Sequence, residues 1–310
     1  MCSSDLGMST LVAVGSIAYD SLETPFGRRD RALGGSAVHF ALAARLFTDV
    51  GVVGVVGGDF DGGPVLGRHG IDTTGIEVVE GGATFAWEGR YGYDLNVAET
   101  LDTRLGVFEH FDPQLSPEHA AAPVLFLGNI VPDIQRKVRA QSQAGFVALD
   151  SMNLWIDIAR DSLIAAMGEV DCVILNDGEA RQLTGEATLT RAARAIASYG
   201  PRIVVIKRGE YGAALFTEGG FFGVPGYPLE EVFDPTGAGD SFAGGFVGYL
   251  AASGQSDPDL EHLRRAVAYG SIVASFNVEE FGTERVQRLT RDEVEHRVAA
   301  FHAMTSFTLI

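Results

Sequence analysis

Short apolar runs separated by helical stretches recur along most of the chain. The stretches between them, such as residues 37–47 and 189–199, are predicted to be helices. Apolar strands that alternate with helices are typical of a parallel sheet with helices on both faces. We therefore expect an α/β fold whose strands lie at residues 11–16, 50–57, 124–127, 146–149, 170–175 and 203–206.

The segment 77–111 has a different pattern, because aromatic and polar residues alternate from Thr84 to Tyr93. A period of two predicts a half-exposed sheet. No long Pro- or Ser-rich linker and no internal repeat divides the chain, so residues 8–310 are expected to form one domain. Residues 1–7 are interpreted as an appended leader before a start at Met8, since they have no basic and apolar regions of a signal peptide.

The composition narrows the partners of the protein. Its 310 residues are 46% hydrophobic, enough for a large core, and the net charge of −18 argues against binding to nucleic acid or an anionic membrane. Two cysteines make no disulfide framework, and no apolar run is long enough to span a bilayer. We therefore expect a cytoplasmic protein with Cys172 as a buried apolar residue.

The most informative passage lies between Phe233 and Phe242. The peptide N–H groups of Gly237, Ala238 and Gly239 can all face one anion, and a helix follows whose N-terminal end favours negative charge. Asp240, in the first turn, is suited to take the proton of an acceptor hydroxyl placed between it and the γ-phosphate of ATP. The alternative is a glycine-rich loop with a capping aspartate.

This passage resembles the C-terminal signature of the ribokinase-like or PfkB carbohydrate kinases, which is close to Asp-Thr-x-Gly-Ala-Gly-Asp. Pro235 is an extra residue between the aspartate and the threonine. The resemblance extends over residues 11–282. It implies a three-layer α/β/α domain with a mostly parallel sheet, a small β lid made of residues 19–31 and 84–104, and catalysis with ATP and Mg²⁺. The need for a monovalent cation stays open.

A second signal, Asn176 and Glu179, follows the strand at 170–175. The two side chains lie on one side of a first helical turn. The family resemblance implies that this pair handles Mg²⁺, through water, and phosphate, for which hard oxygen ligands are suited. An ordinary capping box is the alternative and is favoured when the pair is considered by itself.

A third signal is the glycine-bearing turn that contains Lys207, Gly209 and Gly212. A simple hairpin turn explains both glycines. The resemblance implies instead that the turn borders the ATP site and that the lysine reaches the phosphates. It also implies that Val267 and Gly270 flank the adenine, with helix packing as a strong competing explanation.

On the acceptor side, Gly34 and Gly35 take the place of the family's N-terminal glycine pair and would let a hydroxylated substrate lie against the backbone. His39 stands where relatives usually carry asparagine, which leaves the identity of the substrate in doubt. Asp20 falls where related enzymes hold sugar hydroxyls, although a surface loop aspartate is an equal alternative. Asn129, after the strand at 124–127, is expected to face the substrate.

Other chemistries find little support. No P-loop string occurs, and the histidines and cysteines have no zinc-ligand spacing. His110 and His119 flank a proline-containing loop and are expected to be exposed. Asp150 and Asn153 match a family segment only loosely.

These observations predict an ATP-dependent carbohydrate kinase that phosphorylates a hydroxyl group of a small sugar or sugar-like substrate. A nucleoside kinase acting on the 5′-hydroxyl is the alternative, since Phe85, Trp87, Tyr91 and Tyr93 could stack a base. The same aromatic residues could equally form the buried face of a lid or the contact of a homodimer. A nucleotide-binding sensor without catalysis is a third hypothesis, disfavoured because Asp240 is intact.

Overall fold

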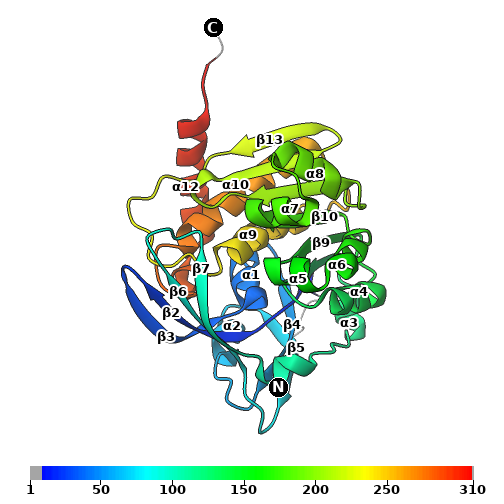
Figure 1. The fold of residues 1–310 in the computed structure, drawn as a ribbon, viewed down its shortest axis with the longest axis vertical. Coiled ribbons are helices and arrows are strands. Elements are labelled where there is room, and N and C mark those ends of the chain that lie inside the picture. The colour runs from blue at the N-terminus through cyan, green and yellow to red at the C-terminus, as the bar shows by residue number, and fades with distance from the viewer. Residues whose placement is uncertain (1–8, 309–310) are drawn as a thin grey trace, which may run out of the picture.

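A computed structural model describes residues 9–308 of the chain (Figure 1). Its main sheet has nine strands, and neighbouring strands are parallel except where β12 and β13 join one edge as antiparallel strands. In spatial order the strands are β13 (Gly220–Val224), β12 (Ala213–Thr217), β11 (Ile203–Lys207), β10 (Cys172–Asn176), β9 (Phe146–Asp150), β8 (Val124–Leu127), β1 (Leu11–Val14), β4 (Val50–Gly57) and β5 (Asp72–Val79).

Helices cover both faces of this sheet, because successive residues of each buried strand point to opposite sides. On β1, for example, Leu11 and Ala13 join one core while Val12 and Val14 join the other. One layer of helices is α1 (Ser36–Ala44), α2 (Gly63–Arg68), α9 (Ala238–Ala252), α10 (Leu260–Asn277), α11 (Glu284–Arg288) and α12 (Arg291–Thr305). The other is α4 (Pro132–Gln141), α5 (Asn153–Ile158), α6 (Arg160–Met167), α7 (Asp177–Thr184) and α8 (Leu189–Ala197). The predicted three-layer α/β/α fold is confirmed.

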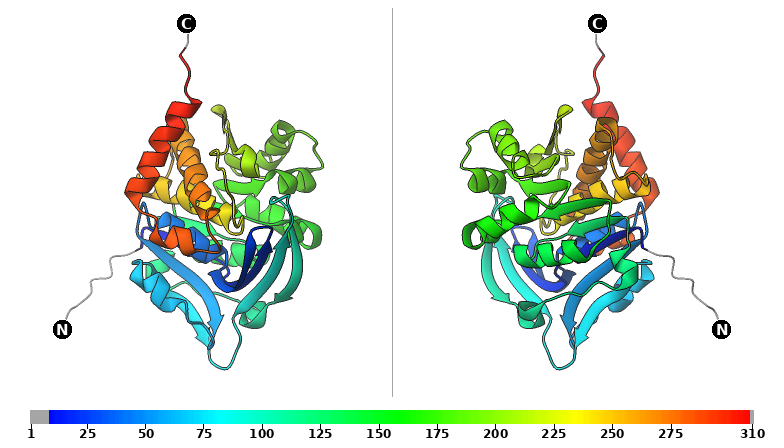
Figure 2. Two further views of the ribbon diagram at one scale, coloured as in Figure 1. Left: turned by 90° about the vertical axis from the view of Figure 1, so that its left-hand side faces the viewer. Right: turned by 90° about the vertical axis from the view of Figure 1, so that its right-hand side faces the viewer.

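A second, four-stranded sheet stands apart from the nine-stranded one (Figures 1 and 2). Its order is β3 (Gly27–Gly34), β2 (Ala18–Thr24), β6 (Phe85–Tyr91) and β7 (Ala98–Arg104). The strand β2 is parallel to β6, and the other two pairs are antiparallel. We call this the small sheet. The alternating segment from Thr84 to Tyr93 supplies β6 of this sheet, whereas β2 and β3 lie in the segment that only the family resemblance assigned to a lid.

The short elements η1 (Gly106–His110) and α3 (Pro117–Ala120) connect the small sheet to β8. The expectation that His119 is exposed is wrong, because its side chain is buried and its Nε2 lies 3.1 Å from Asp72 Oδ2. Gly51 of β4 makes room for the ring, since a Cβ there would come within 3.1 Å of the same nitrogen. His110 is exposed, as expected.

Two further expectations concern the leader and membrane-spanning segments. The interpretation of residues 1–7 as a leader lies outside the described residues. Within residues 9–308, no helix combines the length and the apolar character that a membrane crossing requires.

Candidate active site

The helix α9 begins directly after Gly237, which has a φ of +71° and serves as its N-cap. Left-handed backbone of this kind favours glycine. The N–H groups of Gly239 and Asp240 have no hydrogen-bond acceptor among residues 9–308, so they are free to bind an anion. Ala238 differs from the expectation, because its N–H donates to Pro235 O at 3.2 Å. We call residues 235–240 the anion loop, and all of them are half-buried rather than enclosed in the core.

Asp240 carries the carboxylate at the start of α9. Burial raises its pKa to about 7, the negative charge of Asp150 adds to the rise, and the positive charge of Lys207 opposes it. A pKa close to neutrality suits a group that accepts a proton during turnover. The geometry and the electrostatics therefore agree with the role that the sequence predicts for Asp240.

Asp20, Gly34 and Gly35 lie together beside this carboxylate. Asp20 is buried, with 6% exposure, and a Cβ on Gly34 would overlap its carboxylate. Burial raises the pKa of Asp20 to about 7, and the charges of Asp234 and Asp240 raise it further, while the N–H of Gly35 opposes the rise. The alternative that Asp20 is a surface loop residue is wrong.

Lys207 and Asp150 form an ion pair close to Asp240. Lys207 Nζ lies 2.8 Å from Asp150 Oδ2, and a Cβ on Gly239 would come within 3.0 Å of the same nitrogen. Burial lowers the pKa of Lys207, but the carboxylates of Asp150 and Glu179 outweigh burial and raise it. The ammonium group is therefore charged and adjoins the anion loop. Only a loose family match pointed to Asp150.

Asn176 and Glu179 form a complete capping box at the start of α7. Asn176 Oδ1 accepts from the Glu179 N–H at 2.7 Å, and Glu179 Oε2 accepts from the Asn176 N–H at 2.7 Å. The alternative interpretation of this pair is thus present in the structure. Burial raises the pKa of Glu179 to about 7 against the opposing charge of Lys207, which places this carboxylate in the same charged group.

The protein ligands available to Mg²⁺ at this site are therefore few. Among residues 9–308 no group of three or more His, Cys, Asp or Glu side chains could hold a metal directly. Glu179 retains one carboxylate oxygen outside the capping box, and Asn176 has already used its side-chain oxygen. A hydrated Mg²⁺ that also contacts the phosphates of ATP is compatible with this donor set.

The turn after β11 is a hairpin that contains η2 (Gly209–Tyr211) and leads into β12. Gly209 has a φ of +54°, and a Cβ there would overlap Asn96 from the loop between β6 and β7. A Cβ on Gly212 would overlap the backbone of Val224. The hairpin explanation holds for both glycines, and the small sheet reaches this turn through Asn96.

The structure gives Val267 and Gly270 a packing role in α10. Val267 has no exposed surface, and a Cβ on Gly270 would come within 2.8 Å of the carbonyl oxygen of Phe242 in α9. Direct contact of either residue with adenine would require this helix pair to open. The helix-packing explanation therefore accounts for both positions.

His39 and Asn129 face the scaffold, unlike the expectation. His39 is 1% exposed, and its Nδ1 lies 3.0 Å from Asn277 Oδ1, so it has no surface left for an acceptor substrate. Asn129 Oδ1 accepts from Trp155 Nε1 at 2.8 Å, and Asn129 Nδ2 donates to Met152 Sδ at 3.0 Å. Both side chains are occupied in holding their neighbours.

Two residues touch the anion loop in contacts that sequence reasoning did not predict. Tyr91, the last residue of β6, lies with its hydroxyl 3.1 Å from Thr236 Oγ1, and burial raises its pKa to about 12. Asn277 ends α10 and donates from Nδ2 to Thr236 O at 2.8 Å. The period-two pattern placed Tyr91 on the small sheet, but no signal pointed to Asn277.

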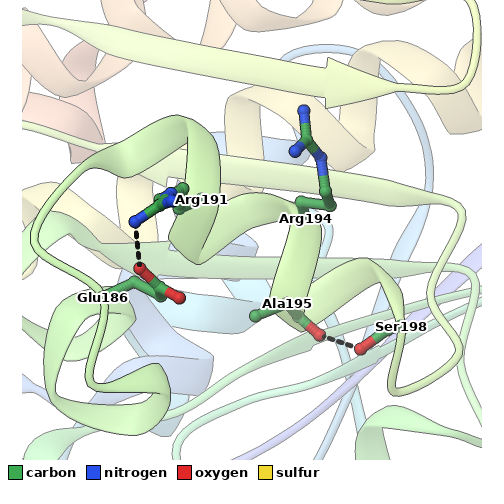
Figure 3. Close-up of a pocket in the computed structure, with 5 residues that line it drawn as sticks. All are labelled: Glu186, Arg191, Arg194, Ala195 and Ser198. Atoms are coloured by element: carbon green, nitrogen blue, oxygen red, sulfur yellow. Dashed lines mark hydrogen bonds and ion pairs between the residues drawn. The ribbon is translucent and has the colours of Figure 1, made fainter.

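A hollow on the surface of α8 is separate from this site (Figure 3). Its lining includes Arg191, which pairs with Glu186 at 3.8 Å, and Arg194. None of its lining residues belongs to the site described above.

Free amide donors, a charged lysine and a carboxylate of raised pKa at one helix terminus form the arrangement of a phosphotransferase. Residues 133–288 match the family model described as pfkB family carbohydrate kinase. Together with the similarity to the first relative below, this match shows that the chain belongs to the pfkB family. The protein is accordingly an ATP-dependent kinase, and the predicted family and enzyme class are confirmed.

Three known proteins illustrate the similarity. A cytidine kinase of Thermococcus kodakarensis is 32% identical over 77% of this chain and 88% of its own length. An ATP-dependent ribose-1-phosphate kinase of Halopiger xanaduensis is 31% identical over 78% of this chain and 80% of its own length. The solved structure of a Burkholderia thailandensis nucleoside kinase with inosine is 22% identical, has a TM-score of 0.76 and covers 94% of this chain and 97% of its own, which shows the shared fold.

Proposed function

We propose that this kinase transfers the γ-phosphoryl group of ATP to the primary hydroxyl of a ribose-containing substrate, and that a nucleoside is preferred to a free sugar. The observation that carries the preference is an aromatic surface on the small sheet beside Asp20. Asp20 and Trp87 are paired residues on the parallel strands β2 and β6, so their side chains lie on the same face of the sheet.

The indole ring of Trp87 is held flat against this face. Its Nε1 donates to Thr100 Oγ1 at 3.2 Å, and a Cβ on Gly89 would overlap the ring, so the ring lies across that glycine. Tyr91 follows on the same face, because alternate residues of a strand point to one side. An aromatic surface fixed in this way can stack a base while the carboxylate of Asp20 holds ribose hydroxyls. The similarity to a cytidine kinase agrees with this proposal.

The chain's own residues divide the chemistry between them. Asp240 accepts the proton of the acceptor hydroxyl. The free N–H groups of Gly239 and Asp240, with Gly237 allowing the turn, bind the transferred phosphoryl group, and Lys207 adds positive charge beside them. ATP bound with Mg²⁺ supplies the phosphoryl group, and Glu179 is the side chain that would meet the hydrated ion.

In this proposal the small sheet acts as a lid. Tyr91 contacts the anion loop, and Asn96, in the loop between β6 and β7, lies against the turn at Gly209, so the small sheet with its connecting loop reaches both segments. A lid that covers the site excludes water, which competes with the substrate as acceptor.

Three further features belong to the proposal. The strand β7 is exposed along its length at an edge of the small sheet, and a second copy of the chain could cover it in a homodimer. A monovalent cation is a candidate activator, which rates measured in K⁺ and in Na⁺ would reveal. A cytoplasmic location agrees with the reduced, buried Cys172.

The test is ADP release by the purified protein with ATP, Mg²⁺ and a panel of nucleosides, ribose, ribose 1-phosphate and other sugars. We expect a nucleoside to give the highest kcat/KM. A clear preference for ribose 1-phosphate or a hexose would contradict the nucleoside assignment. Binding of ATP and a nucleoside without ADP release over hours would favour the sensor hypothesis instead.

A paired variant isolates the aromatic surface. Stacking of one base is worth about 1–3 kcal/mol, so Trp87→Ala should raise the KM for a nucleoside roughly 10- to 100-fold and leave kinetics with ribose nearly unchanged. Val78→Ala is the control, because Val78 is an exposed apolar residue on β5, at the edge of the nine-stranded sheet and outside the small sheet. Equal losses with nucleoside and with ribose would remove Trp87 from base recognition.

A further inference from the structure

Asn277 bonds to both ends of the turn that forms the anion site. Its Nδ2 donates to Thr236 O at 2.8 Å, before the turn, and its Oδ1 accepts from Ser241 Oγ at 2.9 Å, after the turn. The residue is fully buried at the C-terminal end of α10. A single amide thus ties α10 to the backbone on either side of Gly237.

His39 completes this arrangement from α1. Because Thr236 O can only accept, the Asn277 amide must present its oxygen to His39 Nδ1, 3.0 Å away, and Nδ1 must carry the proton. Burial lowers the pKa of His39 to about 4, which keeps the ring neutral. Its Nε2 is buried and has no partner among the described residues.

The ring of His39 also fills the space under the turn. A Cβ on Gly237 would overlap three atoms of the imidazole, so the ring packs directly against this glycine. The left-handed conformation of Gly237, with φ of +71°, is therefore supported by a side chain of fixed shape. At 1% exposure His39 cannot also reach an acceptor substrate.

We infer that His39 and Asn277 are positioning residues for phosphoryl transfer, which hold the anion loop in the conformation that presents its free N–H groups. The inference rests on the proposed function. The sequence connected His39 with the identity of the substrate. The inference connects it instead with the rate of phosphoryl transfer.

The effect should fall on kcat, because a misplaced loop loses contacts made in the transition state while Asp20 still binds the acceptor. His39→Leu should lower kcat about 10- to 100-fold and change the KM for the acceptor by less than about 3-fold. Asn277→Leu should have the same signature. The double variant should lose much less than the product of the two single effects, since both remove one connected network.

His39→Asn provides the rescue. An asparagine places an amide nitrogen two bonds from Cβ, as the imidazole places Nδ1, so it can still donate to Asn277 Oδ1. We expect kcat of this variant within about 3-fold of the parent protein. His119→Leu is the matched control, because His119 is equally buried but bonds to Asp72 on β5. It should lower the melting temperature and leave kcat unchanged.

Three results would overturn the inference: an unchanged kcat in folded His39→Leu protein, a raised acceptor KM at normal kcat, or no rescue by asparagine. Asp240→Asn is measured alongside, and if it keeps full activity the proposed function fails instead. In that case crystal structures of the parent and His39→Leu proteins still decide, because the inference requires the Thr236–Gly237 peptide to shift when the imidazole is removed.

Discussion

Replacing Asp20 with asparagine should stabilise the protein, and more at alkaline than at acidic pH. Asp20 is 6% exposed and faces the carboxylates of Asp234 and Asp240, so its charge is held in an unfavourable place. Asparagine has the same shape and can still accept from the N–H of Gly35. The substitution therefore removes a charge and keeps the hydrogen bond.

The magnitude follows from the pKa of Asp20, which rises from 3.8 to about 7 on folding. Because the pKa of Asp20 is higher in the folded than in the unfolded protein, the folded state binds this proton more tightly. The free energy of unfolding therefore falls as pH rises from 3.8 to about 7. Roughly three pKa units correspond to about 4 kcal/mol at pH 8, as an upper bound. At pH 5 the penalty is only roughly 1–2 kcal/mol, because pH 5 lies a short way above the unfolded pKa and well below the folded one.

The assay is thermal unfolding of the parent protein and Asp20→Asn at pH 5 and pH 8. Near 2 °C per kcal/mol for a chain of this size, the gain in Tm should be roughly 3 °C at pH 5 and up to ~8 °C at pH 8. Asp49→Asn is the control, because Asp49 is exposed and its loss should matter little at either pH. A gain that is equal at both pH values, or larger at pH 5, would refute the reasoning about Asp20.

Three other outcomes are expected at the same site. Lys207→Met should lower kcat roughly 10²-fold, measured as ADP release, because it removes the cation next to Gly239 and leaves Asp150 unpaired; an unchanged kcat would separate Lys207 from the phosphates. Tyr91→Phe removes the hydroxyl contact with Thr236, worth about 1 kcal/mol, and should raise the acceptor KM a few-fold together with ADP release in the absence of acceptor; no change in either would show that this contact does not help to close the lid. The kcat/KM of the parent protein should rise about tenfold per pH unit from pH 5 and level off near 7, as Asp240 becomes ionised; a profile that is flat over this range would contradict the raised pKa of Asp240.

The strands and the layers could be predicted from the sequence because burial on both faces leaves a simple signature. The apolar runs at 124–127 and 203–206 coincide with β8 and β11, apart from the added Lys207. The alternating segment around Trp87 became β6, whose side chains are mostly half-buried rather than enclosed in a core. Local pattern decides these elements.

The contacts that support the anion loop could not be predicted in this way. Asn277 is 41 residues from Thr236 in sequence and 238 from His39, and only the packing of α10 and α1 against α9 brings the three together. The sequence around His39 would be the same whether the side chain faced a substrate or packed against the scaffold. His119 was expected at the surface because it flanks a proline-containing loop, but the space beside Gly51 buries its ring.

The N-terminal turn of α9 illustrates the same limit at smaller scale. The sequence indicates which peptide N–H groups lie in the anion loop, but the geometry of the turn decides which of them have no hydrogen-bond acceptor within the protein. Pro235 O accepts the N–H of Ala238, so Asp240 contributes a backbone donor in its place. The acceptor of the Ala238 N–H is thus Pro235, the residue that is extra relative to the family signature.

The central claim is that Asp240 deprotonates the acceptor beside the anion loop, and kcat of Asp240→Asn tests it most directly. With the best acceptor of the panel, we predict a fall of roughly 10²- to 10⁴-fold, about 3–5 kcal/mol of barrier, with ATP affinity changed by less than about 3-fold. A kcat equal to that of the parent protein would contradict the account.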